Sequence, residues 1–291
     1  MTTIETTAAS EGARRTARAA EDLEPGRAKP FLKWAGGKRQ LLPSIRAAAP
    51  RAYLRYLEPF VGGGAVFFDL APARAILSDA NAELINCYEV VRDRVDALVG
   101  TLREHVYDRE HYYRVRALAP ESLDAVRRAA RTIFLNRTGF NGLYRVNKSG
   151  IFNVPFGRYK NPRICDEPTL RACSARLAGV DLRCRPFEAV LAEAEAGDFV
   201  YFDPPYVPLS RTANFTAYHD LKFALEDQER LARAFEQLAA RGSWVMLSNS
   251  DVDWVRARYA RFNVRDVFAP RRVNSVVSAR GLVRELLVTN Y

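Results

Sequence analysis

Short runs of hydrophobic residues, each bounded by polar or glycine-rich sequence, recur along this chain and predict buried β-strands. They cover residues 53–60, 75–79, 198–202 and 244–248. Two further β-rich runs near the C-terminus, 262–268 and 282–289, predict an antiparallel pair joined through Gly281. We therefore expect a buried sheet with a hairpin at its edge.

Between these runs, hydrophobic residues return at steps of three and four, which is the spacing of one helix face. A long helix is predicted from Ala82 onward, with an apolar face made of Leu84, Tyr88, Val91, Val95, Leu98 and Leu102. Further helices are predicted at 65–70, at about 122–135 and at 225–241. On the helix at 122–135, Arg127, Arg128 and Arg131 fall on the side opposite the apolar face. Strands that alternate with helices predict an α/β fold with a parallel sheet.

The segment 82–165 interrupts this alternation. Within it, residues 136–162 lose helical periodicity and are rich in Asn, Gly, Arg and aromatic residues. We expect three parts: a disordered tail at 1–29, a body formed by 30–81 plus 166–291, and an inserted domain at 82–165.

The charge of the chain narrows the choice of partner. The 291 residues include 44 Lys and Arg against 34 Asp and Glu, which gives a net charge of +10. Opposite charges cancel within residues 1–29, so the excess belongs to the body. A basic body favours a polyanionic partner, most often nucleic acid.

Other features exclude several classes of protein. The four cysteines form no C-x-x-C pair and only three histidines are present, so neither a metal site nor a disulfide framework is predicted. No run of about 18 apolar residues occurs, so no transmembrane helix is expected. The N-terminus lacks an apolar signal core, and we expect a cytoplasmic location.

Two glycine-rich stretches are candidate ligand loops. Glu58-Pro-Phe-Val-Gly-Gly-Gly64 follows a predicted strand, and Asp79 ends the next one. Such a turn allows close approach of the backbone to a nucleotide, but it is also compatible with a plain tight turn. Gly36-Gly37-Lys38 does not match a phosphate-binding P-loop, because Arg39 follows the lysine.

The third candidate is Asp203-Pro204-Pro205-Tyr206, which follows the buried strand at 198–202. The carboxyl edge of a parallel sheet is where such folds bind ligands. Asp203 and the Pro204 carbonyl can both accept hydrogen bonds from one exocyclic amino group, and Tyr206 offers a ring face for stacking a base. The alternative is a rigid turn in which Asp203 caps a helix.

Six motifs follow one another along the chain: F-L-K-W-A-G-G-K (31–38), E-P-F-V-G-G-G-A-V-F (58–67), S-D-A-N (78–81), N-R-T-G-F-N-G-L-Y-R (136–145), F-N-V-P-F-G-R-Y (152–159) and D-P-P-Y (203–206). Together they resemble the Dam-type DNA adenine-N6 methyltransferases, from about residue 30 to the end. Four shorter stretches bring the likeness nearest to the GATC-modifying methylases of type II restriction–modification systems: K-R-Q-L-L-P (38–43), F-F-D-L-A-P (67–72), N-A-E-L-I-N-C-Y (81–88) and L-V-T-N-Y (287–291).

The resemblance implies a Rossmann-like S-adenosylmethionine-dependent methyltransferase sheet with an inserted, mainly helical target-recognition domain and β-hairpin. Its catalytic positions correspond to Asp203, Pro204, Pro205 and Tyr206. Its cofactor positions correspond to Trp34, Lys38, Phe60, Gly62, Gly64, Asp79 and Asp203. Its DNA-contacting positions correspond to Lys33, Asn141, Leu143, Arg145, Pro155 and Tyr159.

The resemblance also implies the partners. Double-stranded DNA is the expected substrate, with S-adenosylmethionine as cofactor, S-adenosylhomocysteine as product and no metal. A cognate restriction endonuclease belongs to such systems, and no stable complex with it is predicted.

The expected reaction is methylation of the N6 amino group of an adenine, within GATC. The base must leave the duplex to reach a buried methyl donor. Tyr206 would stack on it while Asp203 and the Pro204 carbonyl accept its amino hydrogens. Two alternatives stay open: another amino-group methyltransferase acting on DNA cytosine-N4, RNA or protein glutamine, and a non-catalytic DNA-binding regulator.

Overall fold

A computed structural model describes residues 27–147, 149–207, 223–270 and 282–291. The tail predicted at 1–29 lies outside the described residues up to residue 26, as does Gly281 in the predicted C-terminal hairpin. Within the described part, Ala28 packs against the main hydrophobic core and the Lys29 carbonyl accepts a hydrogen bond from the Cys173 thiol. No helix in these ranges is long and apolar enough to cross a membrane.

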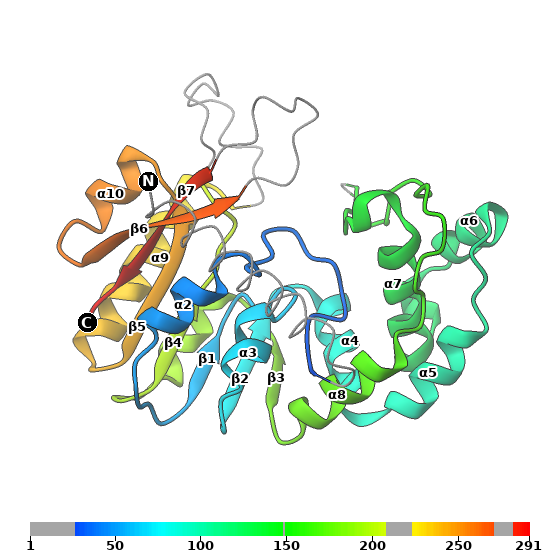
Figure 1. The fold of residues 1–291 in the computed structure, drawn as a ribbon, viewed down its shortest axis with the longest axis horizontal. Helices are drawn as coiled ribbons and strands as arrows, with labels where there is room; N and C mark the ends of the chain where they lie inside the picture. The colour runs from blue at the N-terminus through cyan, green and yellow to red at the C-terminus, as the bar shows by residue number, and fades with distance from the viewer. Residues whose placement is uncertain (1–26, 148, 208–222, 271–281) are drawn as a thin grey trace, which may run out of the picture.

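The described strands form a seven-stranded sheet in the order β3-β2-β1-β4-β5-β7-β6 (Figure 1). The strands are β1 (Tyr56–Glu58), β2 (Ala75–Asp79), β3 (Asp181–Cys184), β4 (Phe199–Phe202), β5 (Trp244–Ser250), β6 (Asn263–Pro270) and β7 (Leu282–Thr289). All neighbours pair in parallel except β7, which runs antiparallel to both β5 and β6. The expected parallel α/β sheet with an antiparallel pair at its edge is therefore confirmed.

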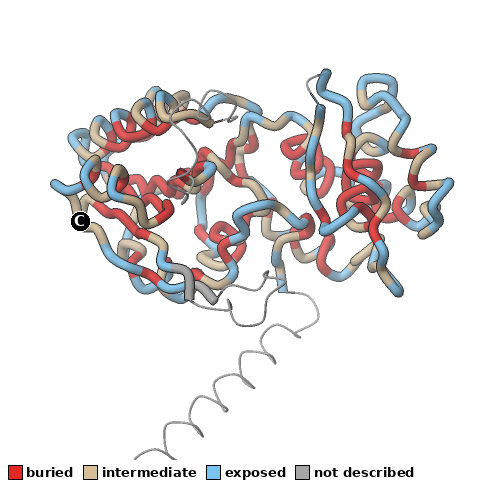
Figure 2. Tube along the Cα trace, turned by 90° about the horizontal axis from the view of Figure 1, so that it is seen from above, coloured by how far each residue is buried: buried red, intermediate tan, exposed pale blue. Residues whose placement is uncertain are grey.

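Alternation along the central strands gives the sheet two apolar faces. In β1, Tyr56 points into one hydrophobic core and Leu57 into the other, and in β4 Tyr201 and Phe202 divide in the same way. The first face is covered by α2 (Leu42–Ala48), α3 (Ala65–Leu70), α4 (Ala82–Asp93) and α8 (Glu167–Leu177). The second is covered by η3 (Phe187–Ala192), α9 (Leu225–Ala240) and α10 (Asp253–Arg258). Figure 2 shows these buried stretches enclosed between exposed helix surfaces.

The long helix expected from Ala82 is two helices. α4 ends at Asp93 and α5 (Val95–Arg103) begins at Val95, because Arg94 between them has a non-helical backbone with φ −138° and ψ 34°. The predicted apolar face survives the break, since Leu84, Tyr88, Val91, Leu98 and Leu102 are all buried.

Beyond α5 the chain forms α6 (Arg109–Ala117), η1 (Pro120–Ser122), α7 (Ala125–Thr138) and η2 (Phe140–Gly142). α6, α7 and residues 152–156 share a small hydrophobic core that includes Tyr112, Phe134 and Val154. Two antiparallel bridges, between Gly139 and Phe156 and between Val146 and Phe152, bring the irregular segment back on itself.

The prediction that Arg131 faces away from the apolar side of its helix is wrong. Arg131 is only 5% exposed. Its guanidinium donates to the carbonyls of Val115 and Arg116, at 3.2 and 2.9 Å. The last carbonyls of a helix have no partner within it, so this arginine caps the end of α6 from α7.

The division of the chain into domains stays a prediction. α4 lies in the segment expected to be inserted. It packs on the strands β2 and β3, on α8, which covers the sheet, and on α7. It therefore joins the sheet to the elements that follow it.

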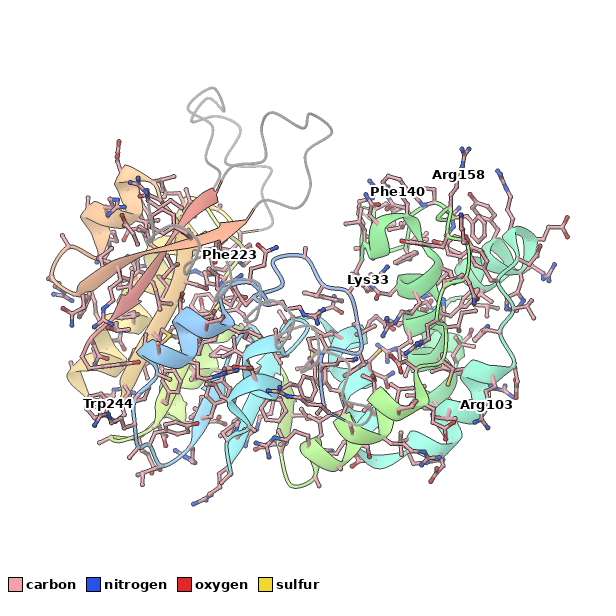
Figure 3. All side chains as sticks on the ribbon, in the orientation of Figure 1. Lys33, Arg103, Phe140, Arg158, Phe223 and Trp244 are labelled. Atoms are coloured by element: carbon pink, nitrogen blue, oxygen red, sulfur yellow. The ribbon has the colours of Figure 1, made fainter. Side chains whose placement is uncertain are left out.

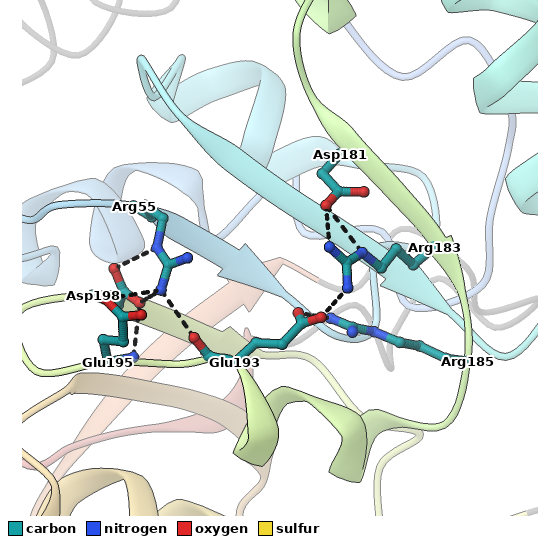
Figure 4. Close-up of polar contacts among 7 residues, drawn as sticks. All are labelled: Arg55, Asp181, Arg183, Arg185, Glu193, Glu195 and Asp198. Carbon is teal, nitrogen blue, oxygen red and sulfur yellow. Dashed lines mark hydrogen bonds and ion pairs between the residues drawn. The ribbon is translucent and has the colours of Figure 1, made fainter.

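The amino ends of β1 and β4 are held by buried charges (Figure 4). Asp198 is fully buried, and Arg55 donates to its two carboxylate oxygens at 3.1 and 2.6 Å. The Glu195 amide also donates to Asp198, at 2.9 Å. Burying an ionised carboxylate costs free energy unless its oxygens accept hydrogen bonds, as they do here. The contact therefore holds the amino ends of the two central strands together.

Candidate functional site

A cavity of about 1100 Å³ opens at the carboxyl ends of β1, β2 and β4. The two neighbouring strands β1 and β4 are where the strand order reverses, the place where such sheets leave a crevice for ligands. The walls of the cavity include all the residues expected at the cofactor, namely Trp34, Lys38, Phe60, Gly62, Gly64, Asp79 and Asp203. The D-P-P-Y turn formed by Asp203, Pro204, Pro205 and Tyr206 borders the same space.

The glycine turn after β1 is closely fitted to its surroundings. Gly62 and Gly64 have φ angles of 47° and 69°, which disfavour any residue with a side chain. A Cβ on Gly62 would lie 2.9 Å from Cδ1 of Trp34, and one on Gly64 would lie 2.5 Å from the Tyr88 hydroxyl. Neither position has space for a side chain, so the turn borders the cavity with bare backbone.

Asp79 closes the neighbouring wall. Its Oδ2 accepts a hydrogen bond from the Gly62 amide at 3.2 Å, and its Oδ1 accepts from the Asn81 amide at 2.9 Å. Burial raises the pKa of this carboxyl, while the backbone hydrogen bonds oppose the shift. Asn81 in turn caps α4 by accepting from the amides of Glu83 and Leu84.

Aromatic rings form two sides of the cavity. Trp34 stacks on Tyr144, with ring centroids 5.2 Å apart and planes 26° apart. Phe60 stacks on Phe187 with the same separation and angle. Both pairs border the cavity, so a planar group would find apolar faces there. Tyr144 and Phe187 were not predicted as site residues; Tyr144 follows a predicted DNA-contacting position, and Phe187 carries no local signal.

Lys38 makes a buried ion pair with Asp203. Its side chain is 6% exposed, and Nζ lies 2.7 Å from Oδ1 of Asp203. The same ammonium donates to the Gly36 carbonyl at 2.5 Å and sits 4.6 Å from the centre of the Tyr206 ring. Segments far apart in the sequence, 34–38 and 203–206, thus meet at one point of the cavity.

The Asp203 carboxylate lies in an environment that opposes its charge. Burial raises its pKa from the ordinary value of 3.8, and the nearby Glu285 carboxylate acts in the same direction. Lys38 and a hydrogen bond from the Ser248 hydroxyl, at 3.0 Å, oppose the rise. Perturbed pKa values cluster at functional sites, which makes this carboxylate a candidate for a functional role.

Buried amides hold the D-P-P-Y turn from behind. Gln228 of α9 donates to the Pro205 carbonyl at 2.8 Å, and Asn249 of β5 donates to Gln228 at 3.1 Å. Asn249 also accepts from the Val207 amide at 3.2 Å. At the end of the turn, the Tyr206 hydroxyl donates to Glu285 of β7 at 2.8 Å. These contacts fix the turn without using the Pro204 carbonyl.

The residues expected at DNA gather mainly outside the cavity. Among them, only Leu143 borders it. Lys33 lies with its Nζ 4.7 Å from the centre of the Tyr159 ring, and a Cβ on Gly142 would lie 2.2 Å from Cδ of Lys33. Asn141 adopts φ 54°, and the Pro155 carbonyl accepts from the Phe140 amide at 2.9 Å. In Figure 3, Phe140 and Arg158 lie at the outer end of the part built on α6 and α7, with Lys33 between that part and the sheet.

Arg145 lies on the neighbouring stretch of the irregular segment. It donates to the side chain of Asn153 at 2.7 Å and to its carbonyl at 3.2 Å. These two bonds orient the guanidinium at the surface, and its other N–H groups are not used in them.

One buried amide links these residues to the cavity. Asn136 is 1% exposed, and its side chain accepts from the Lys33 amide and donates to the carbonyls of Lys33 and Gly142, each at 2.8 Å. It thus fastens the segment that carries Lys33, Trp34 and Lys38 to the turn at 140–142.

A second cavity of about 590 Å³ adjoins Lys33. Its charged lining is mainly cationic: Arg27, Lys29, Lys33, Arg39, Arg46, Arg137 and Arg163 against Asp69 and Asp166. This cavity therefore carries a net positive charge, and it shares Lys33 with the residues expected at DNA. Among the described residues, we find no group of His, Cys, Asp and Glu side chains arranged to hold a metal ion.

Known proteins are similar to this sequence over most of its length. Residues 34–272 match the family described as D12 class N6 adenine-specific DNA methyltransferase. The type II methyltransferase M1.LlaDCHI of Lactococcus lactis subsp. cremoris is 45% identical over 271 residues, covering 90% of this chain and 95% of that protein. The DNA adenine methylase of Escherichia coli K12 is 42% identical over 261 residues, covering 88% and 93%. The chain therefore belongs to the D12 class of N6 adenine-specific DNA methyltransferases.

Proposed function

We propose that this enzyme methylates the N6 amino group of adenine within GATC, with S-adenosylmethionine in the 1100 Å³ cavity and the target adenine against the D-P-P-Y turn. Methylation of adenine N6 in DNA is the reaction of its family. One observation carries the proposal: the Asp203 carboxylate borders the same cavity as the glycine turn and Asp79. A donor and an acceptor of the methyl group could therefore meet beside one carboxylate.

The cavity fits the cofactor. Gly62 and Gly64 border the cavity with bare backbone, which a ligand can approach closely. Asp79 ends β2, where its carboxylate can accept a hydrogen bond from a ribose hydroxyl. Trp34 and Phe60 offer apolar faces for a purine ring. When bound, S-adenosylmethionine supplies a methyl group on a sulfonium centre, which needs no further activation.

The D-P-P-Y turn supplies what the adenine requires. The amino nitrogen is a poor nucleophile because its lone pair is delocalised into the ring. Asp203 and the Pro204 carbonyl would each accept a hydrogen bond from the amino group. These two bonds would hold the nitrogen with its lone pair facing the cofactor. Tyr206 would stack on the base after it has left the helix. Such residues accelerate the reaction through position and charge.

Duplex DNA would lie across the cationic surface beside Lys33. We propose Lys33, Asn141, Leu143, Arg145, Pro155 and Tyr159 as its contacts, with Arg145 reading a guanine. The type II methyltransferases among the relatives support a further proposal, that a restriction endonuclease of the same specificity accompanies the enzyme without forming a stable complex.

A digestion experiment tests the proposal. Unmethylated plasmid is incubated with the enzyme and S-adenosylmethionine, then cut separately with a nuclease blocked by adenine methylation in GATC and with one that requires it. We expect protection from the first and cleavage by the second, and neither with Asp203→Ala. Labelled methyl groups incorporated without protection would exclude GATC, and full activity of Asp203→Ala would exclude the assigned site.

A further inference from the structure

A short chain of buried hydroxyl groups ends on the Asp203 carboxylate. The Tyr201 hydroxyl lies 2.9 Å from Oγ of Ser248, and that Oγ donates to Oδ1 of Asp203 at 3.0 Å. Tyr201 and Ser248 are both fully buried. Tyr201 lies on β4 and Ser248 on the neighbouring β5, where the pairing of Phe202 with Leu247 sets Ser248 beside Asp203.

The direction of this chain follows from the chemistry of its last member. An ionised carboxylate can only accept hydrogen bonds, so the Ser248 proton points toward Asp203. Ser248 must then accept at its oxygen, and the Tyr201 hydroxyl is the donor that fills this place. Each hydroxyl has one partner to which it donates, which satisfies the polar groups that the strands bury.

The contacts to Asp203 are unequal at its two oxygens. The Lys38 ammonium and the Ser248 hydroxyl both meet Oδ1, at 2.7 and 3.0 Å. No hydrogen bond or ion pair from another described residue ends on Oδ2. The carboxylate is therefore held by one oxygen while the other is left for a ligand.

We propose that Ser248 is a positioning residue for the methyl transfer, which turns the Asp203 carboxylate so that Oδ2 accepts the hydrogen bond from the adenine amino group. Tyr201 supports it by orienting the serine hydroxyl. This inference rests on the proposed role of Asp203 in the cavity. It adds the atom that meets the substrate and the group that presents this atom.

Ser248 acts in a way that Lys38 does not. The Lys38 ammonium also donates to the Gly36 carbonyl, and as a compact charge it attracts the carboxylate with little preference for direction. The serine hydroxyl is fixed on a central strand, so its bond defines one orientation of the Asp203 side chain. A positioned carboxylate matters because a displacement of about 1 Å at a reacting centre lowers rates roughly a hundredfold.

The test compares Ser248→Ala with Ser248→Thr, which keeps the hydroxyl. We expect kcat of Ser248→Ala to fall about 10- to 100-fold, the range for one hydrogen bond to a charged group, with KM for DNA and S-adenosylmethionine changed less than about twofold. Ser248→Thr should recover most of the rate. Tyr201→Phe should cost less, about threefold, because Ser248 can still donate to Asp203.

Ser243→Ala is the matched control. Ser243 is a buried serine directly before β5, and it donates to the Glu195 carbonyl at 3.0 Å. It should show a similar loss of thermal stability without the loss of kcat. A Ser248→Ala enzyme that keeps the wild-type kcat, or loses no more of it than Ser243→Ala, would overturn the inference.

The pH profile gives a second readout. Ser248 lowers the pKa of Asp203, so its removal should move the acid limb of kcat to higher pH, with Ser243→Ala unchanged. Lys38, Glu285, Tyr201 and Tyr206 also face Asp203 and are the same in both enzymes. An acid limb at the wild-type pH in Ser248→Ala would contradict a direct contact.

Methyl transfer is scored as label incorporated into DNA, whatever the sequence modified. If wild-type enzyme labels DNA outside GATC, the proposed target fails while the comparison of Ser248 variants still stands. If wild type is active in GATC and Ser248→Ala is equally active, the inference fails and the proposed function survives.

Discussion

Two aspartates flank β4, and their carboxylate oxygens differ in how completely they are hydrogen-bonded. Asp198 precedes the strand, and its carboxylate oxygens accept from Arg55 and from the Glu195 amide. Asp203 follows the strand, and its protein contacts with Lys38 and Ser248 converge on a single oxygen. The two carboxylates are separated by only the four residues Phe199–Phe202.

On the proposed function, the difference separates a charge that holds the fold from a charge that binds a ligand. At the amino edge of the sheet, both oxygens of the buried Asp198 carboxylate accept hydrogen bonds, as Figure 4 shows. At the carboxyl edge burial raises the pKa of Asp203, so its ionised form carries a net cost. Completeness of pairing, more than burial or charge alone, distinguishes the two roles.

The largest expected effect is on turnover when Asp203 becomes asparagine. Asp203→Asn keeps the shape of the side chain but removes its charge, and kcat should fall about 1000-fold in single-turnover methylation of an oligonucleotide. Binding of DNA should change much less. Asp198→Asn is the matched control. An equal loss of kcat in both variants would contradict the different roles assigned to the two aspartates.

Asp198→Asn should instead lower stability. The Arg55 guanidinium would lose its bidentate partner, but it is partly exposed, so the free energy of unfolding should fall by only about 1 to 2 kcal/mol. Urea unfolding followed by circular dichroism measures this change, and kcat per folded molecule should stay within about twofold. A stability equal to wild type would mean that Glu195, whose carboxylate lies 3.7 Å from Arg55, replaces Asp198.

A smaller effect is expected at the link between Tyr206 and Glu285. Tyr206→Phe keeps the ring but removes its hydrogen bond, and kcat/KM should fall about tenfold. Glu285→Ala should give a similar loss, and the double variant should be no worse than either single one, since the contact can be lost only once. Additive losses would show that the two side chains act separately.

The smallest effect is a difference in the pH dependence of stability. A folded-state pKa above the ordinary 3.8 means that the native protein holds the Asp203 proton more tightly than the unfolded chain. Stability from this group is therefore present below pH 3.8 and is lost as pH rises through the folded-state pKa. The melting temperature of wild type relative to Asp203→Asn should fall with rising pH over that window, and a rise would contradict the sign.

Local patterns predicted much of the sheet but not all of it. The apolar runs of β2, β4 and β5 are predicted because strands buried on both faces leave continuous apolar runs. The helix α9 is predicted because its buried residues recur at the spacing of one helix face. β3 was missed because only Leu182 in it is buried. The break at Arg94 was also missed, since the apolar spacing continues through it, and Arg131 was misassigned because its partners lie on another helix.

The candidate site divides in the same way. The glycine turn, Asp79 and the D-P-P-Y turn stand out in the sequence because special backbone angles and strand ends restrict the residue type. Ser248, Gln228 and Glu285 do not, because their roles arise from strand order and from pairing between distant segments. A serine in an apolar strand becomes meaningful only when its neighbour in the sheet is known.

The Asn136 side chain has a consequence for how such an enzyme can diverge. It binds the backbone of Lys33 and Gly142 together, and Lys33 lies five positions before Lys38 in the same segment. If Lys33 contacts DNA and Lys38 holds Asp203 as proposed, a mutation that shifts this joint would change target choice and reaction rate together. New specificities should therefore arise more readily at Arg145 and Asn153, whose contacts with each other lie apart from that joint.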